Sequence, residues 1–254
     1  MNIHCEACSY SVGNKLILNK VSLRVSSGEI LSLVGANGAG KTSLIKLFAG
    51  ELQGTSGQVK FGDRALSKIG LDMRARHIAF LPQKSGLEFP FRVREVIEMG
   101  RYPQLTGKVF DQKIISEVIS EFDLVHLEDR IYTSLSGGEK QRVQIARILA
   151  QLWDTEDAFY LFDEPTAPLD LAHQLAFFKL IGTLAKRGAG ILLAIHDLNL
   201  AARFSDRMIL LKQGEVIAEG APEEVITKEK IQMGFDVNVQ IHRRAEDSVI
   251  QISY

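Results

Sequence analysis

Mostly apolar runs of strand length occur at four places in the chain, and a glycine or a polar residue closes each one. The runs cover residues 29–34, 78–83, 158–164 and 190–196. They are too short for typical helices and are bounded by turn residues, so they indicate β-strands. The last two runs lack polar alternation, which is typical of central parallel strands covered on both faces. The pattern predicts an α/β fold around a parallel sheet.

Helical periodicity fills the region between residues 85 and 150. Residues 93–99 and 110–122 each predict a helix, and a third helix is expected over 140–150. The apolar face of the second helix consists of Ile114, Ile115, Val118, Ile119 and Phe122. We expect a helical lobe inserted into the α/β core.

Turn residues between β-rich segments indicate antiparallel hairpins near both ends of the chain. One hairpin is expected over residues 3–25 around Gly13-Asn14, and another over 208–218 around Gln213-Gly214. The remaining expected elements are a short strand at 59–61, a helix starting at 221–224 and two short strands near 237–241 and 249–252.

The first apolar run leads into Gly35–Thr42, which fits the phosphate-binding pattern G-x-x-x-x-G-K-[ST]. Glycines let successive backbone N–H groups point at phosphate oxygens. Lys41 supplies a positive charge for the β- and γ-phosphates, and the Thr42 hydroxyl can ligate Mg²⁺. A helix over 42–49, stopped by Gly50, would place the phosphates at its N-terminus. The motif predicts a nucleoside triphosphate site.

Polar side chains close the other three strands, at Gln83, at Asp163-Glu164 and at His196. Ligands of open α/β sheets bind beyond the carboxyl ends of the strands. Asp163 could hold Mg²⁺ through water, Glu164 would lie beside an attacking water, and Gln83 could reach either. Taken singly, each could instead be a solvated strand end, and a lone histidine is usually structural. Their common position predicts a catalytic edge.

The stretch from Leu135 to Arg142 carries two adjacent glycines at a predicted helix start. Ser136 and Glu139 have the spacing of a capping box, which explains those two residues as local structure. Gly137 and Gly138 cost backbone entropy and are not explained by the cap. They indicate a second anion site, on a different element from the first.

Composition and charge narrow the function classes. The chain has 254 residues and a formal net charge of −1, so it carries no global basic footprint for nucleic acid. We find no apolar run long enough to cross a bilayer and no signal peptide at the N-terminus, so an unexported chain is expected. Cys5 and Cys8 are the only cysteines, and in a regular strand they would face opposite sides. Reduced, non-ligating thiols are the favoured interpretation over a redox pair or half a metal site.

Six motifs in order give the chain a close resemblance to ATP-binding-cassette ATPases over nearly its whole length. Gly35–Thr42 resembles the Walker A motif, Leu135–Glu139 the signature motif and Phe159–Glu164 the Walker B motif. Gln83 resembles the Q-loop residue and His196 the switch histidine. Ala167–Asp170 resembles the D-loop, although Pro168 departs from the small residue common there.

The resemblance implies a P-loop NTPase fold with a RecA-like core, an N-terminal antiparallel β subdomain and an inserted α-helical subdomain. The core would cover about 1–84 and 151–220, the helical subdomain about 85–150, and a C-terminal extension about 221–254. The implied ATP-binding residues are Gly35, Ala36, Asn37, Gly38, Ala39, Gly40, Lys41, Thr42, Ser43 and Tyr10. Tyr10 is the candidate adenine-stacking residue, although the family's aromatic aligns nearer Val12.

The same resemblance implies roles for the other site residues. Glu164 would be the general base, and His196 and Gln83 would act with it in hydrolysis. Thr42, Gln83 and Asp163 would hold Mg²⁺. A head-to-tail homodimer would bring four residues of one subunit to the ATP of the other, with Asp170 of the D-loop nearby. These four are Ser136, Gly137, Gly138 and Glu139.

Several segments resemble ATPase subunits of bacterial importers whose membrane subunits are separate chains. Residues 94–103 resemble importers for vitamin B12, ferric siderophores and hemin, whereas 89–91, 149–153 and 170–174 most resemble the hemin importers. The implied function is ATP-driven hemin import from the cytoplasmic face of the inner membrane. The implied partners are two permease subunits and, indirectly, a periplasmic binding protein, with no nucleic acid. Siderophore or vitamin B12 import and a non-transport ATPase are the alternatives.

Overall fold

The computed structural model describes residues 1–243 and 250–253. Its centre is a sheet in which β6, β7, β8, β3 and β9 lie side by side in parallel, and β10 adds one antiparallel edge. The strands are β3 (Ile30–Val34), β6 (Ile78–Leu81), β7 (Phe159–Asp163), β8 (Gly190–Ala194), β9 (Arg207–Lys212) and β10 (Glu215–Gly220). The predicted parallel sheet and its four strands are confirmed.

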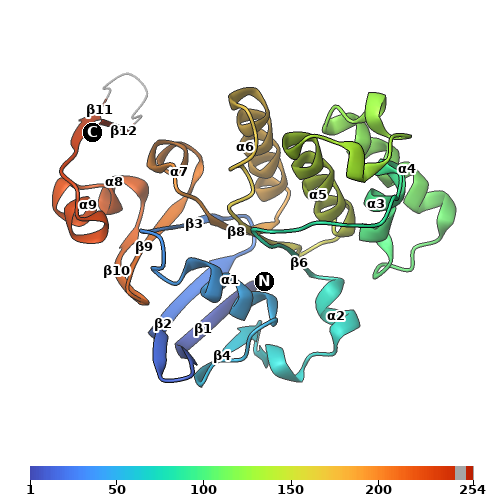
Figure 1. Ribbon diagram of the computed structural model, residues 1–254. Coiled ribbons are helices and arrows are strands. Elements are labelled where there is room, and N and C mark those ends of the chain that lie inside the picture. Colours follow the sequence, from blue (N-terminus) through green and yellow to red (C-terminus); the bar gives the residue numbers. More distant parts are fainter. Residues whose placement is uncertain (244–249, 254) are drawn as a thin grey trace.

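Helices and a second sheet cover the two faces of the central sheet (Figure 1). Helix α1 (Lys41–Ala49) packs on one face, and α5 (Gly137–Gln151), α6 (Leu171–Lys186) and α7 (Leu198–Phe204) pack on the other. Strand β7 contributes alternate residues to two separate buried clusters. Phe159 and Leu161 belong to the cluster containing α1, and Tyr160 and Phe162 to the cluster containing α5 and α6. The expected burial of this strand on both faces is confirmed.

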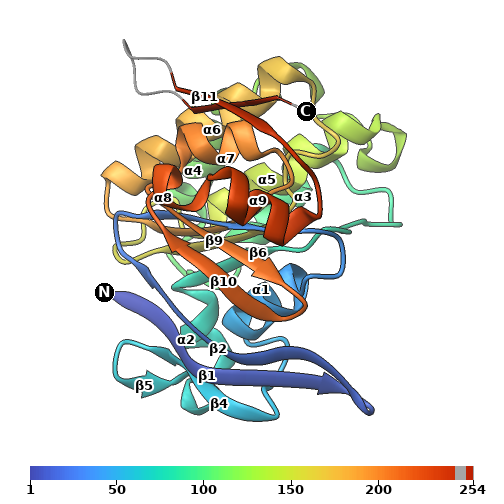
Figure 2. The same cartoon turned by 90° about the vertical axis from the view of Figure 1, so that its left-hand side faces the viewer.

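The N-terminal antiparallel sheet lies below α1 and has the order β2-β1-β4-β5 (Figure 2). Its strands are β1 (Asn2–Val12), β2 (Lys15–Ser26), β4 (Ser56–Phe61) and β5 (Arg64–Ala65), and the short helix α2 (Leu71–Ala75) follows. The first predicted hairpin is therefore confirmed, with its turn at Gly13-Asn14. Strand β4 begins earlier than the predicted strand at 59–61.

A β-bulge in β1 contradicts the expected orientation of the two cysteines. The pairing register with β2 shifts between Cys5 and Cys8, and Ala7 takes a left-handed φ of 46°. The extra residue returns both cysteines to the buried face, where they are 2% and 1% exposed. The prediction that they face opposite sides is wrong, because a bulge breaks the two-residue period.

The helical subdomain contains α3 (Val93–Glu98), α4 (Lys108–Glu121) and α5, joined by short 3₁₀ turns. All three predicted helices are confirmed. The predicted apolar face of the second helix is buried, because Ile114, Ile115, Val118 and Ile119 join the larger core cluster.

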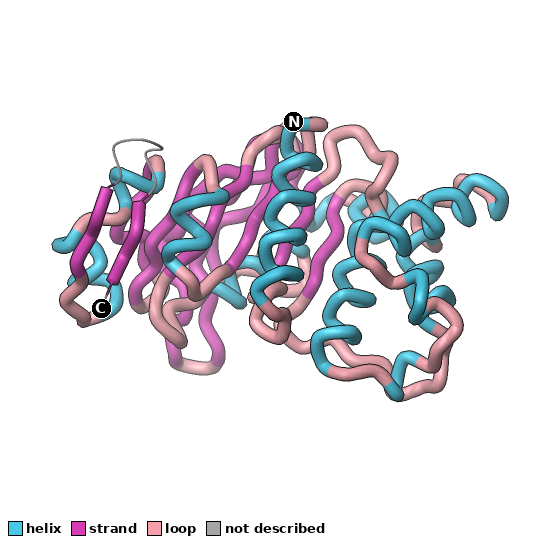
Figure 3. Tube along the Cα trace, turned by 90° about the horizontal axis from the view of Figure 1, so that it is seen from above, coloured by secondary structure: helices cyan, strands magenta, loops and turns pink. Residues whose placement is uncertain are grey.

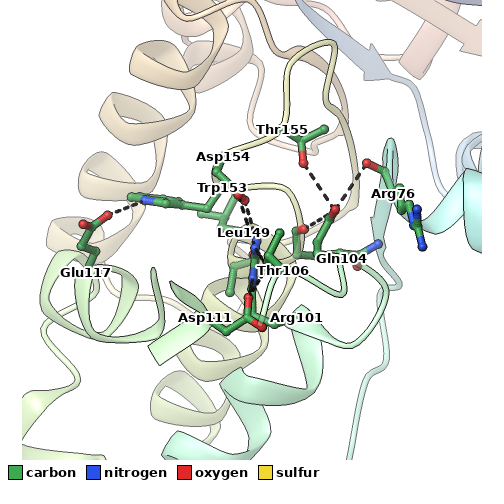
Figure 4. A network of polar contacts seen from close by, with 12 residues as sticks. Arg76, Arg101, Gln104, Thr106, Asp111, Glu117, Leu149, Trp153, Asp154 and Thr155 are labelled. Atoms are coloured by element: carbon green, nitrogen blue, oxygen red, sulfur yellow. Dashed lines mark hydrogen bonds and ion pairs between the residues drawn. The ribbon is translucent and has the colours of Figure 1, made fainter. Parts of the chain in front are cut away.

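Arg101, which is 2% exposed, ties the loop after α3 to the end of α5 (Figure 4). Its guanidinium donates to Asp111 at 2.8 Å, to Asp154 at 2.7 Å and to the Ala150 carbonyl at 2.8 Å. Thr106 hydroxyl, which accepts from Arg101 at 2.9 Å, donates to Asp111 at 2.6 Å. The network satisfies a buried charge with carboxylates and a carbonyl, as burial of a charge requires.

The C-terminal extension lies at the end of the molecule opposite the helical subdomain (Figures 1 and 3). It contains α8 (Pro222–Val225), α9 (Lys228–Phe235), β11 (Gln240–Arg243) and β12 (Ile250–Ser253). The two predicted terminal strands are present, but Val237 and Val239 precede the first of them, and Val249 lies outside the described residues. Helices α6 and α9 were not among the predicted elements.

Candidate functional site

The predicted polar strand ends lie at one edge of the central sheet. Strands β3, β8, β7 and β6 are adjacent and parallel, so their carboxyl ends face the same way. Gly35 follows β3, His196 lies just beyond β8, and Glu164 follows β7. Gln83 lies just beyond β6. The sheet thus gathers side chains that are far apart in sequence, where a doubly wound sheet binds its ligand.

The glycines of the glycine-rich loop have different structural roles. Gly40 has a φ of 106° immediately before α1, and a Cβ there would lie 2.7 Å from Leu18 Cδ2. Gly38 has a φ of 79°, but nothing lies within 4 Å of a Cβ placed there. Gly40 therefore allows close packing against β2, whereas Gly38 borders open space at the start of α1. That space is where a helix N-terminus can bind an anion.

A cavity of about 580 Å³ occupies this space. Its lining residues are Lys15, Leu16, Ile17, Asn37, Gly38, Ala39, Gly40, Lys41, Thr42, Ser43, Gln83, Glu164 and Gln213. Most of the loop thus meets two of the polar strand ends in one cavity. The residues that sequence reasoning missed come from β2 and from the β9–β10 turn. That turn was predicted, but only the fold brings it to the loop, where Gly214 N–H donates to the Ala39 carbonyl at 2.9 Å.

Tyr10 is not among the residues that line this cavity. It lies in β1 opposite Leu18, half-buried against the core cluster that contains α1. Val12 is exposed near the tip of the same hairpin. A role for Tyr10 in stacking on adenine stays a prediction, and Leu16 and Ile17 are the apolar side chains that the cavity presents.

Glu164 is held in place by its backbone and by two polar neighbours. Its φ of 54° is left-handed, and its N–H donates to the Ala194 carbonyl at 3.1 Å. Gln83 Nε2 donates to one carboxylate oxygen at 2.6 Å, and His196 Nε2 hydrogen-bonds to the other. A non-glycine residue in this conformation is uncommon, and such residues cluster at active sites. The three strand-end residues therefore form one connected polar cluster.

Asp163 and Lys41 are both buried, and within the described part of the chain neither forms a salt bridge. Thr42 hydroxyl donates to Asp163 Oδ1 at 3.2 Å, whereas the buried Asp163 Oδ2 has no hydrogen-bond partner. Burial raises the pKa of Asp163. Burial lowers the pKa of Lys41, whose ammonium donates to the Gly35 carbonyl at 2.7 Å. A cation at Asp163 and an anion at Lys41 would compensate both charges.

The second glycine pair lies at the start of α5, as predicted. Ser136 and Glu139 form the expected capping box, with Ser136 N–H donating to the Glu139 carboxylate at 2.7 Å. A Cβ on Gly137 would have nothing within 4 Å, whereas one on Gly138 would lie 3.3 Å from the Pro168 carbonyl. None of these residues lines the cavity at the glycine-rich loop. Within one chain, the two predicted anion sites are not brought together.

The segment before α6 connects that helix start to β7. Gln141 Nε2 donates to the Pro165 carbonyl at 2.7 Å. Asp170 is the N-cap of α6 and accepts from the His173 N–H at 2.9 Å and from its ring at 2.8 Å. These hydrogen bonds from His173 hold the pKa of Asp170 below its ordinary value. The loop that follows Glu164 is therefore in contact with the start of α5.

Among the described residues, no helix combines the length and apolar character needed to cross a membrane.

Comparisons with known proteins give a consistent assignment. The family model described as "ABC transporter" matches residues 18–167. A hemin import ATP-binding protein, HmuV, from Pseudomonas fluorescens is 44% identical over 91% of each chain.

Solved structures give the same result for the fold. The dimeric structure of a bacterial ABC transporter cassette superimposes with a TM-score of 0.77 and 27% identity, covering 87% of this chain and 98% of that one. A post-hydrolysis state of the same cassette, bound to ADP and Pi, has a TM-score of 0.77 and 25% identity over the same shares. With the P-loop, the signature helix and the polar strand ends all in place, the chain belongs to the ABC transporter family, as one of its ATPase subunits.

Proposed function

We propose that this chain hydrolyses ATP to drive hemin import through separate permease subunits. The observation that carries the hydrolytic part is the cluster of Gln83, Glu164 and His196 beside the phosphate-binding loop. The cargo assignment is supported by the relative from Pseudomonas fluorescens, whose name states hemin import. It is also supported by the resemblance of residues 89–91, 149–153 and 170–174 to hemin importers.

ATP would lie in the 580 Å³ cavity with its phosphates over the start of α1. Lys41 now donates to two backbone carbonyls, and it would turn to the β- and γ-phosphates. Glu164 would accept a proton from the attacking water, once its hydrogen bonds to Gln83 and His196 rearrange. His196 and Gln83 would then hold the water and the γ-phosphate in line. Such positioning supplies most of the rate in phosphoryl transfer.

The residues near Asp163 fit a magnesium ion. An unpartnered buried carboxylate oxygen and the Thr42 hydroxyl are hard oxygen ligands of the kind that Mg²⁺ prefers. Gln83 would complete the protein's contribution, directly or through water. When bound, the ion would neutralise charge between the β- and γ-phosphates.

The active unit would be a homodimer in which each ATP lies between two chains. This is supported by the separation of the two anion sites within one chain and by the open space beside Gly137. Ser136, Gly137 and Gly138 of one subunit would cover the ATP bound by the other, with Glu139 holding the cap. Asp170 would lie next to the same interface because its loop contacts the start of α5.

The proposed membrane partner and the proposed cellular location of this chain both follow from its assignment to the importer class. Two transmembrane subunits would bind the ATPase dimer at the cytoplasmic face of the inner membrane, and a periplasmic binding protein would deliver cargo to them. We expect no nucleic-acid partner, given the net charge of −1.

Growth on different iron sources tests the cargo. A deletion strain should fail to grow with hemin as its sole iron source, and the wild-type gene should restore growth. A gene encoding Glu164→Gln should not restore it, whereas siderophore-dependent growth should be normal in all strains. Loss of siderophore or vitamin B12 uptake with intact hemin use would show that the cargo is wrong and that only the importer class holds.

A further inference from the structure

The bulge in β1 places two thiols next to each other in the N-terminal sheet. Cys5 pairs with Leu23 of β2, and Cys8 pairs with Val21. Leu23 and Val21 are two residues apart on one face, so the cysteines occupy neighbouring positions on the buried face. Two residues of a strand span roughly 6.6 Å. The β2 partners of the two cysteines are thus spaced at the upper end of the Cα distances that disulfides bridge, about 4.4–6.8 Å, and the bulge sets each cysteine opposite its partner.

The two thiols also interact, and they do so unequally. The hydrogen bond between them, together with burial, raises the pKa of Cys5. The same hydrogen bond lowers the pKa of Cys8. The Cys5 thiol donates to the Val21 carbonyl at 3.4 Å. The two shifts leave Cys8 with the lower pKa of the pair, and the thiolate is the form that reacts with oxidants.

A cavity borders one of the two cysteines. This cavity, of about 400 Å³, lies between the N-terminal sheet and the end of α1, where Leu47 and Gly50 line it. Cys8 lines it, and Cys5 does not. The ATP cavity lies at the other end of α1, at Lys41 and Thr42. The thiol pair is thus separate from the hydrolytic site.

We propose that Cys5 and Cys8 form a reversible redox pair, in which a peroxide oxidises Cys8 through this cavity and Cys5 closes the disulfide. The Cys8 sulfur attacks one peroxide oxygen, the O–O bond breaks, and Cys8 becomes a sulfenic acid with release of water or an alcohol. Cys5 then attacks the Cys8 sulfur, the S–O bond breaks, and water leaves as the S–S bond forms. One peroxide is reduced and two thiols are oxidised.

A metal site is the competing use of two adjacent thiols. Among the described residues, no group of three or more histidine, cysteine, aspartate or glutamate side chains could hold a metal ion. A structural metal normally needs four ligands. The pair therefore fits thiol–disulfide chemistry better than metal binding.

Intact-protein mass spectrometry after exposure to hydrogen peroxide tests the proposal on the full chain. Wild type should lose about 2 Da and both titratable thiols, and dithiothreitol should restore both. Cys5→Ala leaves Cys8 without a partner, so it should gain about 16 Da as a sulfenic acid that dimedone traps. Cys8→Ala should react much more slowly, because its remaining thiol does not line the cavity. Circular dichroism would show that each variant is folded.

Three results would overturn the proposal. The first is a wild-type chain whose two thiols survive peroxide unchanged. The second is a wild-type chain that gains oxygen without the loss of two hydrogens, because the thiols would then not pair. The third is faster oxidation of Cys8→Ala than of Cys5→Ala, which would reverse the order of attack.

Discussion

At the scale of single residues, the site contains charges that its own protein does not fully compensate. Burial raises the pKa of Asp163 and lowers that of Lys41, so in both residues the charged form is disfavoured without a ligand. A Mg²⁺–triphosphate complex carries the opposite charges in the required places. In the function proposed above, this complex would compensate both charges, and Glu164 would be the neighbouring group that accepts a proton.

Replacing Glu164 by glutamine keeps the size of the side chain and one acceptor oxygen, but it removes the negative charge and the basicity. Because a positioned base contributes roughly 10²–10⁴ in rate, Glu164→Gln should lower kcat of the permease-reconstituted ATPase by about that factor. ATP affinity should stay close to that of wild type. Glu128→Gln, which changes a surface ion pair with Arg94, is the matched control and should hydrolyse ATP normally. Near-normal turnover in Glu164→Gln would remove this residue from the base role.

At the scale of elements, the two glycines at the start of α5 allow a structural role to be distinguished from a functional one. Neither glycine of the pair has a left-handed φ, so alanine is conformationally allowed at both. Gly137 has free space around it, whereas Gly138 abuts the Pro168 carbonyl. Local structure alone gives no reason for glycine at position 137. The reason proposed above is that Gly137 lies against a phosphate of the ATP bound by a second chain.

Unfolding of the isolated subunit in urea would test this distinction. Gly137→Ala should raise the free energy of unfolding by about 0.4–1 kcal/mol, because alanine lowers the entropy of the unfolded chain. Gly138→Ala should gain less, since its Cβ would press on the Pro168 carbonyl at 3.3 Å. A clear loss of stability in Gly137→Ala would mean that position 137 serves the fold, and the argument for a second chain would fail.

The Arg101 network gives the helical subdomain a predictable response to acid. Burial raises the pKa of Asp111, but hydrogen bonds from Thr106 and Arg101 outweigh it and hold the pKa below its ordinary value. A carboxylate with a lowered folded-state pKa stabilises the protein above the unfolded-state pKa. That contribution is lost as pH falls through the folded-state pKa.

Asp111→Asn should therefore be less stable than wild type at pH 7, and the difference in unfolding free energy should shrink below about pH 4. Urea titrations at a series of pH values measure it. Lys113→Gln, on the exposed side of α4, should show no comparable trend. A difference that is the same at pH 7 and at low pH would contradict the assigned charge state.

At the scale of the whole molecule, the gathering of polar residues at one edge of the parallel sheet was predictable. Apolar runs that end on polar residues can be recognised in the sequence without knowing how side chains pack. Gln83, Glu164 and His196 met as expected, and Gly35 lies at the same sheet edge, because β3, β8, β7 and β6 are neighbours. The left-handed residues Ala7 and Glu164 were not predictable, because neither alanine nor glutamate favours that conformation.

Contacts made only by the fold were equally beyond the sequence. The β9–β10 turn could be predicted from the sequence. Its contact with the phosphate-binding loop, through Gly214 and Ala39, could not. Leu16 and Ile17 belong to no recognisable motif, and their place in the cavity at the glycine-rich loop follows from the packing of β2. Sequence motifs thus located the polar residues of the candidate site, and only the tertiary structure showed which other residues line the cavity around them.

The central claim is that two chains close around ATP, with the start of α5 from one covering the loop of the other. Light scattering of Glu164→Gln during size-exclusion chromatography tests it directly. We predict a monomer alone and with ADP, a dimer with Mg²⁺ and ATP, and a monomer in all conditions for the Glu164→Gln, Gly137→Ala double variant. A Glu164→Gln chain that stays monomeric in saturating ATP, or a double variant that dimerises at the same ATP concentration, would contradict the account.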